Sequence, residues 1–311
     1  MSKSKQHTSG PFQDVLSQIW PASFLQGIDK SITYLNKEYP DTEESSQAPI
    51  FIFSAGWRTG STLLQRLVNS DSDVALFGEA FEHLFLWHQL ANQFKNFSIS
   101  DKRHSCYIPE NYAKIFPNEL DEFLTKAFTA NLSPPVSHLK KAHQSFIETL
   151  LREPVERVGR KIWGLKLVRS DITIAKYLQW LYPKARFIFL VRNPYDTCNS
   201  CLNIIKRNKH ALPLIVGSHY ISNAHDYAAH WRHCISGFLE ESKKLNSIMI
   251  KYEDLITGEK IKPISSFLNI KINKNILQNK VGETQKEEQL SEEDRIILEG
   301  IAGNQIKILG Y

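Results

Sequence analysis

Residues 51–68 read FIFSAGWRTGSTLLQRLV, an apolar run followed by small and polar residues and then by apolar residues at helical spacing. The apolar run predicts a buried strand, and the segment from Gly60 onward predicts a helix. In such a turn the backbone N–H groups of the loop and of the first helical turn converge, and the positive end of the helix dipole favours negative charge. We therefore interpret the loop as a site for a phosphate-like anion, to which Arg58 adds a cation and Ser61 and Thr62 add hydroxyl groups.

The loop departs from the P-loop that binds nucleoside triphosphates. That motif has Gly, four residues and then Gly-Lys-Ser/Thr, with the Lys on the β- and γ-phosphates and the hydroxyl group on Mg²⁺. Here Ala55 replaces the first Gly, and Ser61 stands where the Lys would be. Because the Lys is a main cationic contact to a triphosphate, the loop favours a smaller terminal anion. A generic βα turn with a hydroxyl N-cap is the alternative interpretation.

A second informative region has two predicted strands, 162–167 and 186–191, joined by a predicted helix in a βαβ crossover. Arg192 directly follows the second strand, and Ser200 lies eight residues further on, in the next predicted helix. Both residues are therefore expected at the carboxyl edge of a parallel sheet, where open α/β folds bind ligands.

These two regions together resemble the sulfotransferase family, whose members use 3′-phosphoadenosine 5′-phosphosulfate (PAPS). Residues 57–62, WRTGST, are similar to the family's 5′-phosphosulfate loop, commonly Pro-Arg/Lys-Ser-Gly-Thr-Thr, with Trp57 in place of the usual Pro. Arg192 and Ser200 are similar to its 3′-phosphate site. The resemblance covers about residues 50–311 and is weakest between 81 and 160. It implies that PAPS, and the product adenosine 3′,5′-bisphosphate (PAP), are bound by Arg58, Thr59, Gly60, Ser61, Thr62, Arg192 and Ser200.

Two further segments resemble the tyrosylprotein sulfotransferase-like and bacterial subgroup. Residues 77–80, FGEA, are similar to the Gly-Glu segment whose Glu is the proposed base, and residues 164–166, GLK, are similar to the strand that carries the catalytic Lys. The ending LGY is similar to that subgroup's C-terminal helix.

Transfer of a sulfuryl group to a hydroxyl requires a base, cations for the charge on the leaving oxygen, and in-line alignment. The resemblance implies Glu79 as the base, with Lys166 and Arg58 as the cations, and it implies no metal. Glu82 and His83 remain alternative bases, since cytosolic members of the wider family use a His.

The expected fold class is α/β, a P-loop-NTPase-like parallel sheet flanked by helices. Residues 50–311 are expected to form a single sulfotransferase domain, in which the helical insertion 81–160 forms a lid and the acceptor side. Residues 1–49 are expected to be a partly helical N-terminal extension. Strands are predicted at 50–54, 74–77, 162–167, 186–191 and 247–251, and helices at 60–69, 172–181, 195–206, 223–243, 259–268 and 291–308.

The amino-acid composition limits the classes of molecule that the protein is expected to bind. The 311 residues include 42% hydrophobic residues and carry a net charge of +5, without the dense basic block of a nucleic-acid binder. No run of 18 apolar residues occurs, so we expect no membrane span.

Cys198 and Cys201 have C-x-x-C spacing without a second pair at metal-site spacing, and we interpret them as core residues. Reduced thiols predict a cytoplasmic location.

Three functions remain at this point. The leading one is a sulfotransferase acting on a hydroxyl acceptor, which is a glycan, a lipid, a small molecule or a peptide tyrosine. The second is a P-loop kinase-like, nucleotide-dependent transferase, which the missing Lys disfavours. The third is a non-catalytic nucleotide-binding or scaffold protein. The sequence leaves open the acceptor, the oligomeric state, and the roles of residues 1–49 and of the loop 280–290.

Overall fold

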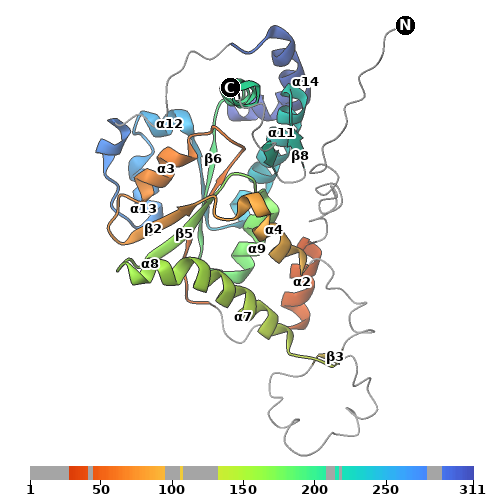
Figure 1. The fold of residues 1–311 in the computed structure, drawn as a ribbon, viewed down its shortest axis with the longest axis vertical. Helices are drawn as coiled ribbons and strands as arrows, with labels where there is room; N and C mark the ends of the chain where they lie inside the picture. Colours follow the sequence, from red (N-terminus) through yellow and green to blue (C-terminus); the bar gives the residue numbers. More distant parts are fainter. Residues whose placement is uncertain are drawn as a thin grey trace, which may run out of the picture.

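The structure is a computed structural model that describes residues 28–40, 45–94, 106–107, 132–207, 214–216, 219–278 and 289–311. At its centre lies a five-stranded sheet with the order β2-β5-β1-β6-β9 (Figure 1). All neighbouring strands in this sheet are parallel. The strands are β1 (Ile50–Ser54), β2 (Val74–Gly78), β5 (Ile162–Leu167), β6 (Arg186–Val191) and β9 (Ser247–Lys251). The five predicted strands are confirmed, with β2 one residue longer than predicted.

Helices cover both faces of this sheet, which confirms the predicted α/β class. The six predicted helices are confirmed within two residues at each end, and further helices lie in the segments around them. The helices are α2 (Ile28–Glu38), α3 (Ser61–Val68), α4 (Leu86–Asn92), α7 (Val136–Ile147), α8 (Glu153–Arg157), α9 (Ile172–Leu181), α10 (Pro194–Arg207), α11 (Ala224–Glu241), α12 (Tyr252–Ile256), α13 (Ile261–Leu268) and α14 (Glu292–Leu309).

The alternation of side chains along the central strands produces two hydrophobic cores, one on each face of the sheet. Phe51 and Phe53 of β1 point to the face covered by α9, α11 and α14, whereas Ile50 and Ile52 point to the face covered by α3 and α13 (Figure 1). All four side chains are fully buried. The strands therefore read as continuous apolar runs, as expected for a parallel sheet with both faces covered.

Local capping fixes where several helices begin. The side chains of Asp171, Asn223 and Ser291 accept hydrogen bonds from backbone N–H groups in the first turns of α9, α11 and α14. The last helix ends at Gly310, whose φ of 69° lies in the left-handed region that glycine adopts without strain. These signals are local, which is why the sequence predicts the helix ends closely.

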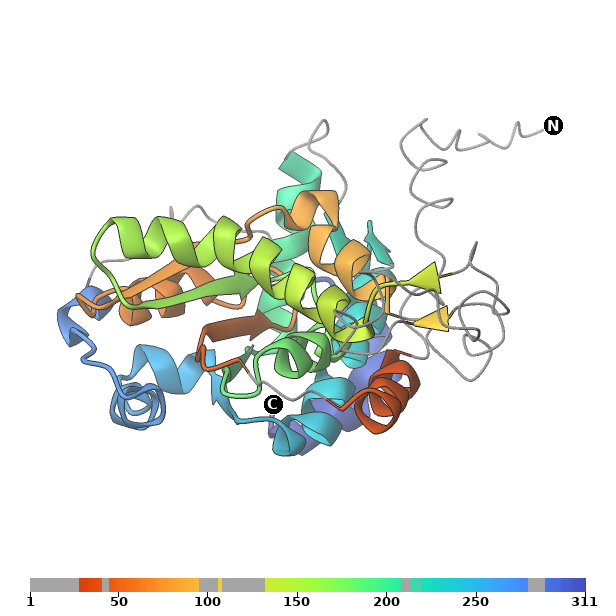
Figure 2. The same ribbon diagram turned by 90° about the horizontal axis from the view of Figure 1, so that it is seen from below.

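The described part of the N-terminal extension includes one helix, α2, which packs on the sheet domain. Helix α2 lies against α9 (Figure 1, Figure 2). Lys176 Nζ lies 2.9 Å from Asp29 Oδ2, and the Trp180 indole N–H donates to Asn36 Oδ1 over 2.8 Å. Helix α2 thus lies within the segment 1–49 that is expected to be partly helical, and residues 1–27 lie outside the described residues.

The segment 81–160 is helical where the structure describes it, apart from two very short strands. It includes a 3₁₀ turn (Glu82–Leu84), α4, α7, a π-helical turn (Glu148–Arg152) and α8. Two strands that the sequence did not predict, β3 (Cys106–Tyr107) and β4 (Leu132–Ser133), pair in parallel. Residues 95–105 and 108–131 of the expected helical insertion lie outside the described residues.

The order of the strands in the sheet determines which of its edges is expected to bind a ligand. After β1 the chain passes through α3 to β2, on the far side of β5, and later returns to β6 on the other side of β1. The carboxyl end of β1 is therefore a topological switch point, where ligands bind in open α/β sheets. Among the described residues, no helix is both long enough and apolar enough to cross a membrane.

Candidate anion-binding and transfer site

The loop between β1 and α3 holds free backbone donors at the switch point. Gly60 caps α3 with a φ of 86°, and no side chain accepts a hydrogen bond at this cap. Its carbonyl accepts from the N–H groups of Leu63 and Leu64, over 3.0 and 3.2 Å. Among the described residues, the N–H groups of Gly60, Ser61 and Thr62 have no backbone acceptor. An anion seated here would meet these donors and the positive end of the helix dipole.

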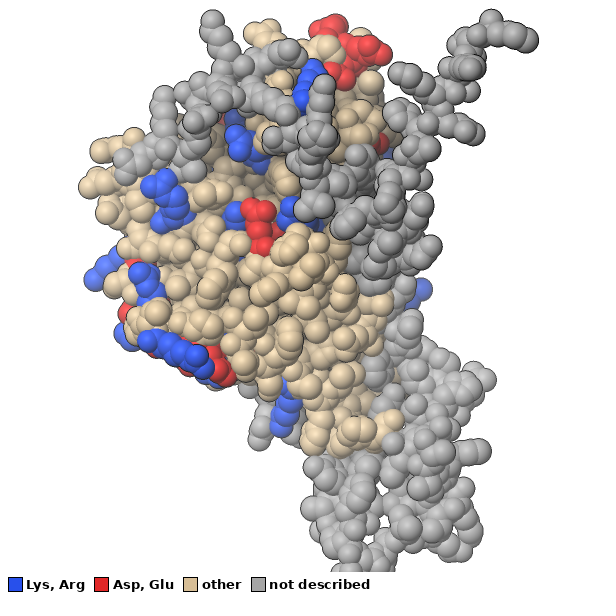
Figure 3. Space-filling model, in the orientation of Figure 1, with Lys and Arg blue, Asp and Glu red and all other residues tan. Residues whose placement is uncertain are grey.

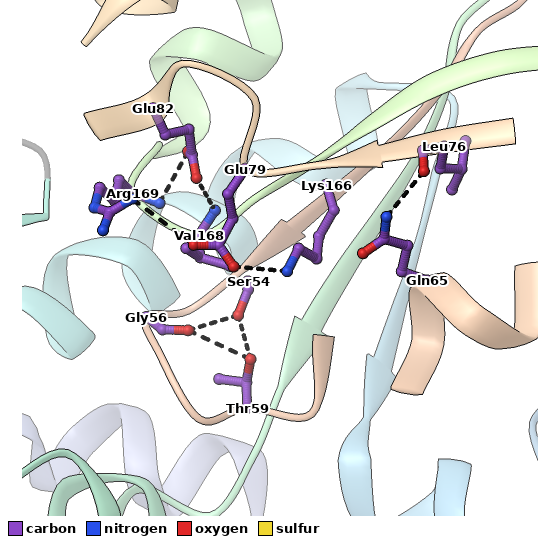
Figure 4. Close-up of polar contacts among 10 residues, drawn as sticks. All are labelled: Ser54, Gly56, Thr59, Gln65, Leu76, Glu79, Glu82, Lys166, Val168 and Arg169. Carbon is purple, nitrogen blue, oxygen red and sulfur yellow. Dashed lines mark hydrogen bonds and ion pairs between the residues drawn. The ribbon is translucent and has the colours of Figure 1, made fainter. Parts of the chain in front are cut away.

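Thr59 has its side chain turned away from this cradle. It is fully buried, and its hydroxyl lies against the Ser54 hydroxyl and donates to the Gly56 carbonyl over 3.3 Å (Figure 4). The Ser54 hydroxyl also donates to the Gly56 carbonyl, over 2.6 Å. These bonds brace the loop from inside, so the backbone N–H is the group that Thr59 offers to a ligand.

The two predicted donor-binding regions meet directly. The Arg58 Nε–H donates to the Ser200 hydroxyl over 3.0 Å, although the two residues lie 142 positions apart. The Arg192 guanidinium donates from Nη1 to the Arg58 carbonyl over 2.9 Å. Arg58, Arg192 and Ser200 therefore form one connected group at the carboxyl ends of β1 and β6, as an elongated ligand with two anionic groups would require.

Glu79 and Lys166 form an ion pair beside the loop. Lys166 Nζ lies 2.7 Å from Glu79 Oε1, with side-chain exposures of 5% and 36% (Figure 4). The two strands bring them together, because Gly78 of β2 is in register with Lys166 of β5. The Glu79 N–H also donates to the Lys166 carbonyl over 2.9 Å. The more exposed partner of this pair is the carboxylate of Glu79.

Arg169 completes this cluster, although the sequence analysis did not assign it to the site. Its Nη1 lies 3.7 Å from Glu79 Oε2, and its guanidinium stacks on Trp57 of the loop, 4.7 Å from the ring centroid. The sequence signal for Arg169 is its position two residues after the end of β5, at the carboxyl edge where open α/β sheets bind ligands. The stacking partner is the residue that stands where sulfotransferase loops usually have Pro.

The backbone around Glu79 is held in an uncommon conformation. Glu79, Phe81 and Phe85 all have positive φ, at 49°, 58° and 54°. Such residues cost on the order of 1–3 kcal/mol each and cluster at functional sites. The strain here turns the chain sharply after β2 and keeps the carboxylate of Glu79 at the sheet edge.

Glu82, one of the two alternative bases, is a structural anchor. Its carboxylate accepts from the N–H groups of Val168 and Arg169, over 2.9 and 3.0 Å, and from the Ser170 hydroxyl over 3.0 Å (Figure 4). Its side chain is buried, and burial raises the pKa of Glu82 to about 7, against the opposing effect of the three hydrogen bonds. This carboxylate ties the 79–85 turn to the end of β5. His83, the other alternative, is exposed on the 3₁₀ turn.

Charges of both signs reach the surface on this side of the molecule. On the face shown in Figure 3, basic side chains flank an acidic one near the middle of the molecule. Within the cluster described above, Arg58 is exposed and Glu79 half-buried. The site thus offers an accessible cation, Arg58, and a partly accessible carboxylate, Glu79.

The two cysteines of the C-x-x-C pair belong to the core. Cys198 and Cys201 lie on α10, are buried and are not joined in a disulfide. Burial raises the pKa of both thiols, that of Cys201 to about 12. Buried thiols of this kind pack as small apolar side chains, as the sequence predicted.

The chain is similar to known sulfotransferases. The model of the sulfotransferase family matches residues 49–271. The chain is similar to the solved sulfotransferase domain from the curacin biosynthetic pathway (18% identity, 86% of this chain and 99% of that chain covered, TM-score 0.45). It is also similar to a sulfotransferase from Alicyclobacillus acidocaldarius (16%, 85% and 95%, 0.43) and to one from Mycobacterium avium (12%, 98% and 87%, 0.48). No curated protein sequence matches it.

The family match spans well over half of the chain and includes the anion loop, the Glu79–Lys166 pair and the Arg192–Ser200 pair. It sets aside the kinase-like and non-catalytic alternatives. The chain belongs to the sulfotransferase family and is a sulfotransferase enzyme.

Proposed function

We propose that this sulfotransferase takes its sulfuryl group from PAPS and transfers it to a hydroxyl acceptor, with Glu79 as the general base. In this proposal the N–H groups of residues 59–62 and the Arg58 guanidinium bind the 5′-phosphosulfate, and Arg192 and Ser200 bind the 3′-phosphate. Charge-assisted hydrogen bonds from guanidinium groups are among the stronger contacts to phosphate.

The observation that carries the donor assignment is the 3.0 Å hydrogen bond between Arg58 Nε and the Ser200 hydroxyl. It brings the loop that would hold the 5′ end of the donor next to the group that would hold the 3′-phosphate. A donor with one anionic end would use only the loop. A nucleoside bisphosphate uses both groups, and the residues present fit it.

The transfer step assigns one task to each charged group. The acceptor oxygen attacks sulfur in line while its proton passes to a carboxylate oxygen of Glu79. The bond between sulfur and the bridging oxygen breaks, and its electron pair stays on the 5′-phosphate of PAP. Lys166 and Arg58 stabilise the negative charge that develops on that oxygen, and preorganised donors of this kind are each worth about 2.7–4 kcal/mol.

Donor binding tests the proposal without knowledge of the acceptor. PAP, without added metal, should raise the thermal midpoint of unfolding, in line with a stabilisation of RT ln(1 + [L]/Kd), whereas ATP with Mg²⁺ should have little effect. If ATP with Mg²⁺ stabilised the protein more than PAP, and a chelator abolished the effect, the donor assignment would be wrong.

Sulfate-labelled PAPS tests the transfer itself. A panel of glycan, lipid, phenolic and tyrosine-peptide acceptors should reveal a labelled product in at least one class. Residues 50–311 are proposed to act as one domain in this reaction, with 81–160 on the acceptor side. The cytoplasmic location expected from the cysteines stays a prediction.

A further inference from the structure

We propose that the guanidinium of Arg169 binds the oxygens of the sulfuryl group during its transfer, between the anion loop and Glu79. Arg169 follows the end of β5, on one side of β1, whereas Arg192 follows β6, on the other side. The inference rests on the proposed donor and base, and it assigns a substrate contact to a residue that has no task in the proposed transfer step.

The Arg169 guanidinium has donors that no described protein group uses. It carries five N–H groups, and none of them donates a hydrogen bond within the part of the chain that the structure describes. Its ion pair with Glu79 Oε2 is long, at 3.7 Å, and the Arg169 side chain is 15% exposed. Leaving the donors of a largely buried charged group without acceptors is costly. The guanidinium is therefore suited to an anionic ligand that reaches it from the site.

Contacts at both ends of the residue hold this guanidinium in place. The Arg169 backbone N–H donates to Glu82 Oε1 over 3.0 Å (Figure 4). At the other end, the guanidinium stacks on the ring of Trp57, 4.7 Å from its centroid. Trp57 directly precedes Arg58, so the stack fixes the guanidinium against the start of the anion loop. A guanidinium held in this way loses little freedom when it binds a ligand.

The distances of the transfer step bring the sulfuryl group to the same place. The acceptor oxygen has to lie about 2.6–3.2 Å from the Glu79 carboxylate, and sulfur about 3–3.5 Å from that oxygen, so sulfur lies within about 7 Å of the carboxylate. Arg169 Nη1 is 3.7 Å from the same carboxylate. Because the guanidinium contacts both the base and the loop, it borders the space through which the sulfuryl group passes.

The charges at the site require a cation at this point. The sulfuryl group of PAPS is anionic, and an ionised Glu79 beside it would repel it. Lys166 lies 2.7 Å from one oxygen of Glu79 and Arg169 lies 3.7 Å from the other. In the proposed transfer Lys166 turns to the bridging oxygen, so Arg169 is left as the cation between the base and the sulfuryl group. The planar fork of a guanidinium matches two oxygens of one anionic group.

A comparison of PAPS with PAP tests the inference, because the two molecules differ only in the sulfuryl group. Calorimetry without an acceptor gives the ratio of the PAPS affinity to the PAP affinity in each variant. Arg169→Gln should lower this ratio by about 10- to 100-fold, the range for hydrogen bonds to a charged group, while PAP affinity stays near the wild-type value. Arg169→Lys keeps the charge but loses the fork, and it should lower the ratio less than Arg169→Gln does.

Arg295→Gln is the matched control, because Arg295 also lies over an aromatic ring, that of Tyr195, 5.4 Å from its centroid and outside the proposed site. This variant should keep the wild-type ratio. Trp57→Leu removes the stacking partner of Arg169. It should lower the ratio in the wild-type background and change it little in the Arg169→Gln background, because the group that the ring orients is then absent.

Two results would overturn the inference. One is an unchanged ratio in Arg169→Gln, which is expected if Arg169 binds an anionic group of the acceptor instead. The other is an equal loss of affinity for PAPS and PAP, which is expected if Arg169 only maintains the fold of the site. Arg169→Met replaces Arg169→Gln if the latter does not fold. A wild-type protein that binds neither PAPS nor PAP would instead contradict the proposed donor.

Discussion

Lys166 Nζ lies 2.7 Å from Oε1 of Glu79, although the two residues are 87 positions apart in the chain. The pair joins the proposed cation for the leaving oxygen to the proposed base. In the proposed reaction these groups would act on opposite sides of the transferred group, since one would stabilise the leaving oxygen and the other would take the proton of the attacking hydroxyl. The ion pair is therefore expected to loosen when a donor binds and to offer Lys166 a new anionic partner.

Replacing Glu79 by Gln should lower turnover by about 10²- to 10⁴-fold, the usual contribution of a positioned base, while PAP affinity stays near the wild-type value. The amide keeps the size of the side chain but cannot accept a proton at neutral pH. Steady-state transfer of labelled sulfate and calorimetric binding of PAP measure the two effects.

Asp73→Asn is the matched control for this variant. Asp73 forms an exposed ion pair with Lys161, over 3.1 Å. Both residues lie just before the amino-terminal ends of their strands, β2 and β5, at the edge of the sheet opposite to Glu79 and Lys166. Its loss should leave turnover within about 2-fold of the wild type, because exposed pairs contribute little. Near-normal turnover in Glu79→Gln would remove Glu79 from the mechanism and direct attention to Glu82 or His83.

Lys166→Met should reduce turnover by about 10²- to 10³-fold, since one preorganised charge on the leaving oxygen is lost. Met keeps the length and the apolar stem of Lys at this buried position. The pre-steady-state rate of PAP formation measures the chemical step directly. A variant in which that rate is unchanged, with only product release altered, would contradict the role assigned to Lys166.

Arg192→Ala and Ser200→Ala should weaken PAP binding far more than binding of adenosine 5′-phosphate, because the contacts to the 3′-phosphate are charge-assisted. Calorimetry with both nucleotides gives the two changes. Arg157→Ala serves as the control, since Arg157 is exposed and pairs only with Glu153 among the described residues. Equal weakening for both nucleotides would show that the two residues do not recognise the 3′-phosphate.

Gly60→Ala should abolish donor binding while the sheet domain stays folded. The new methyl group would meet the Tyr252 ring, and the φ of 86° is unfavourable for alanine. Gly300→Ala is the matched control, because a Cβ atom there meets nothing within 4 Å and the residue lies in α14. Thermal unfolding with and without PAP distinguishes a lost site from a lost fold, and wild-type affinity in Gly60→Ala would refute the close contact.

His143 should make stability sensitive to acid. Burial lowers its pKa from 6.5 to about 4, and its ring contacts the Tyr177 hydroxyl, 2.6 Å from Nδ1. In the unfolded chain the His143 imidazole becomes protonated as the pH falls below 6.5, whereas in the folded protein it becomes protonated only near pH 4. This contribution to the free energy of unfolding is therefore fully present above pH 6.5 and is lost as the pH falls to 4. The loss amounts to about 1–3 kcal/mol.

Urea unfolding at pH 7.5 and pH 4.5 measures this effect. The difference between the two pH values should be smaller in His143→Gln than in the wild type by that amount. His225→Gln is the control, because the His225 side chain is 71% exposed. An identical pH dependence in the wild type and in His143→Gln would mean that the folded protein accepts the proton without cost.

The sequence by itself determined the elements and the local sites. The five central strands, the helices after them and the anion loop all follow from patterns within about twenty residues, because burial on both faces, caps and turn residues act over short stretches of chain. The spacing of Arg192 and Ser200 is of the same kind, since it depends only on a strand that runs into a helix.

Only the tertiary structure decided how these parts meet. The buried carboxylate of Glu82 accepts three hydrogen bonds, whereas the carboxylate of Glu79 remains accessible. The sequence alone does not distinguish these two carboxylates, because they lie three residues apart in one short segment. The tertiary structure also brings Tyr252 against Gly60 and Arg192. The physical reason is the register of parallel strands: side chains far apart in sequence become neighbours at one sheet edge, and no local pattern encodes which of them will touch.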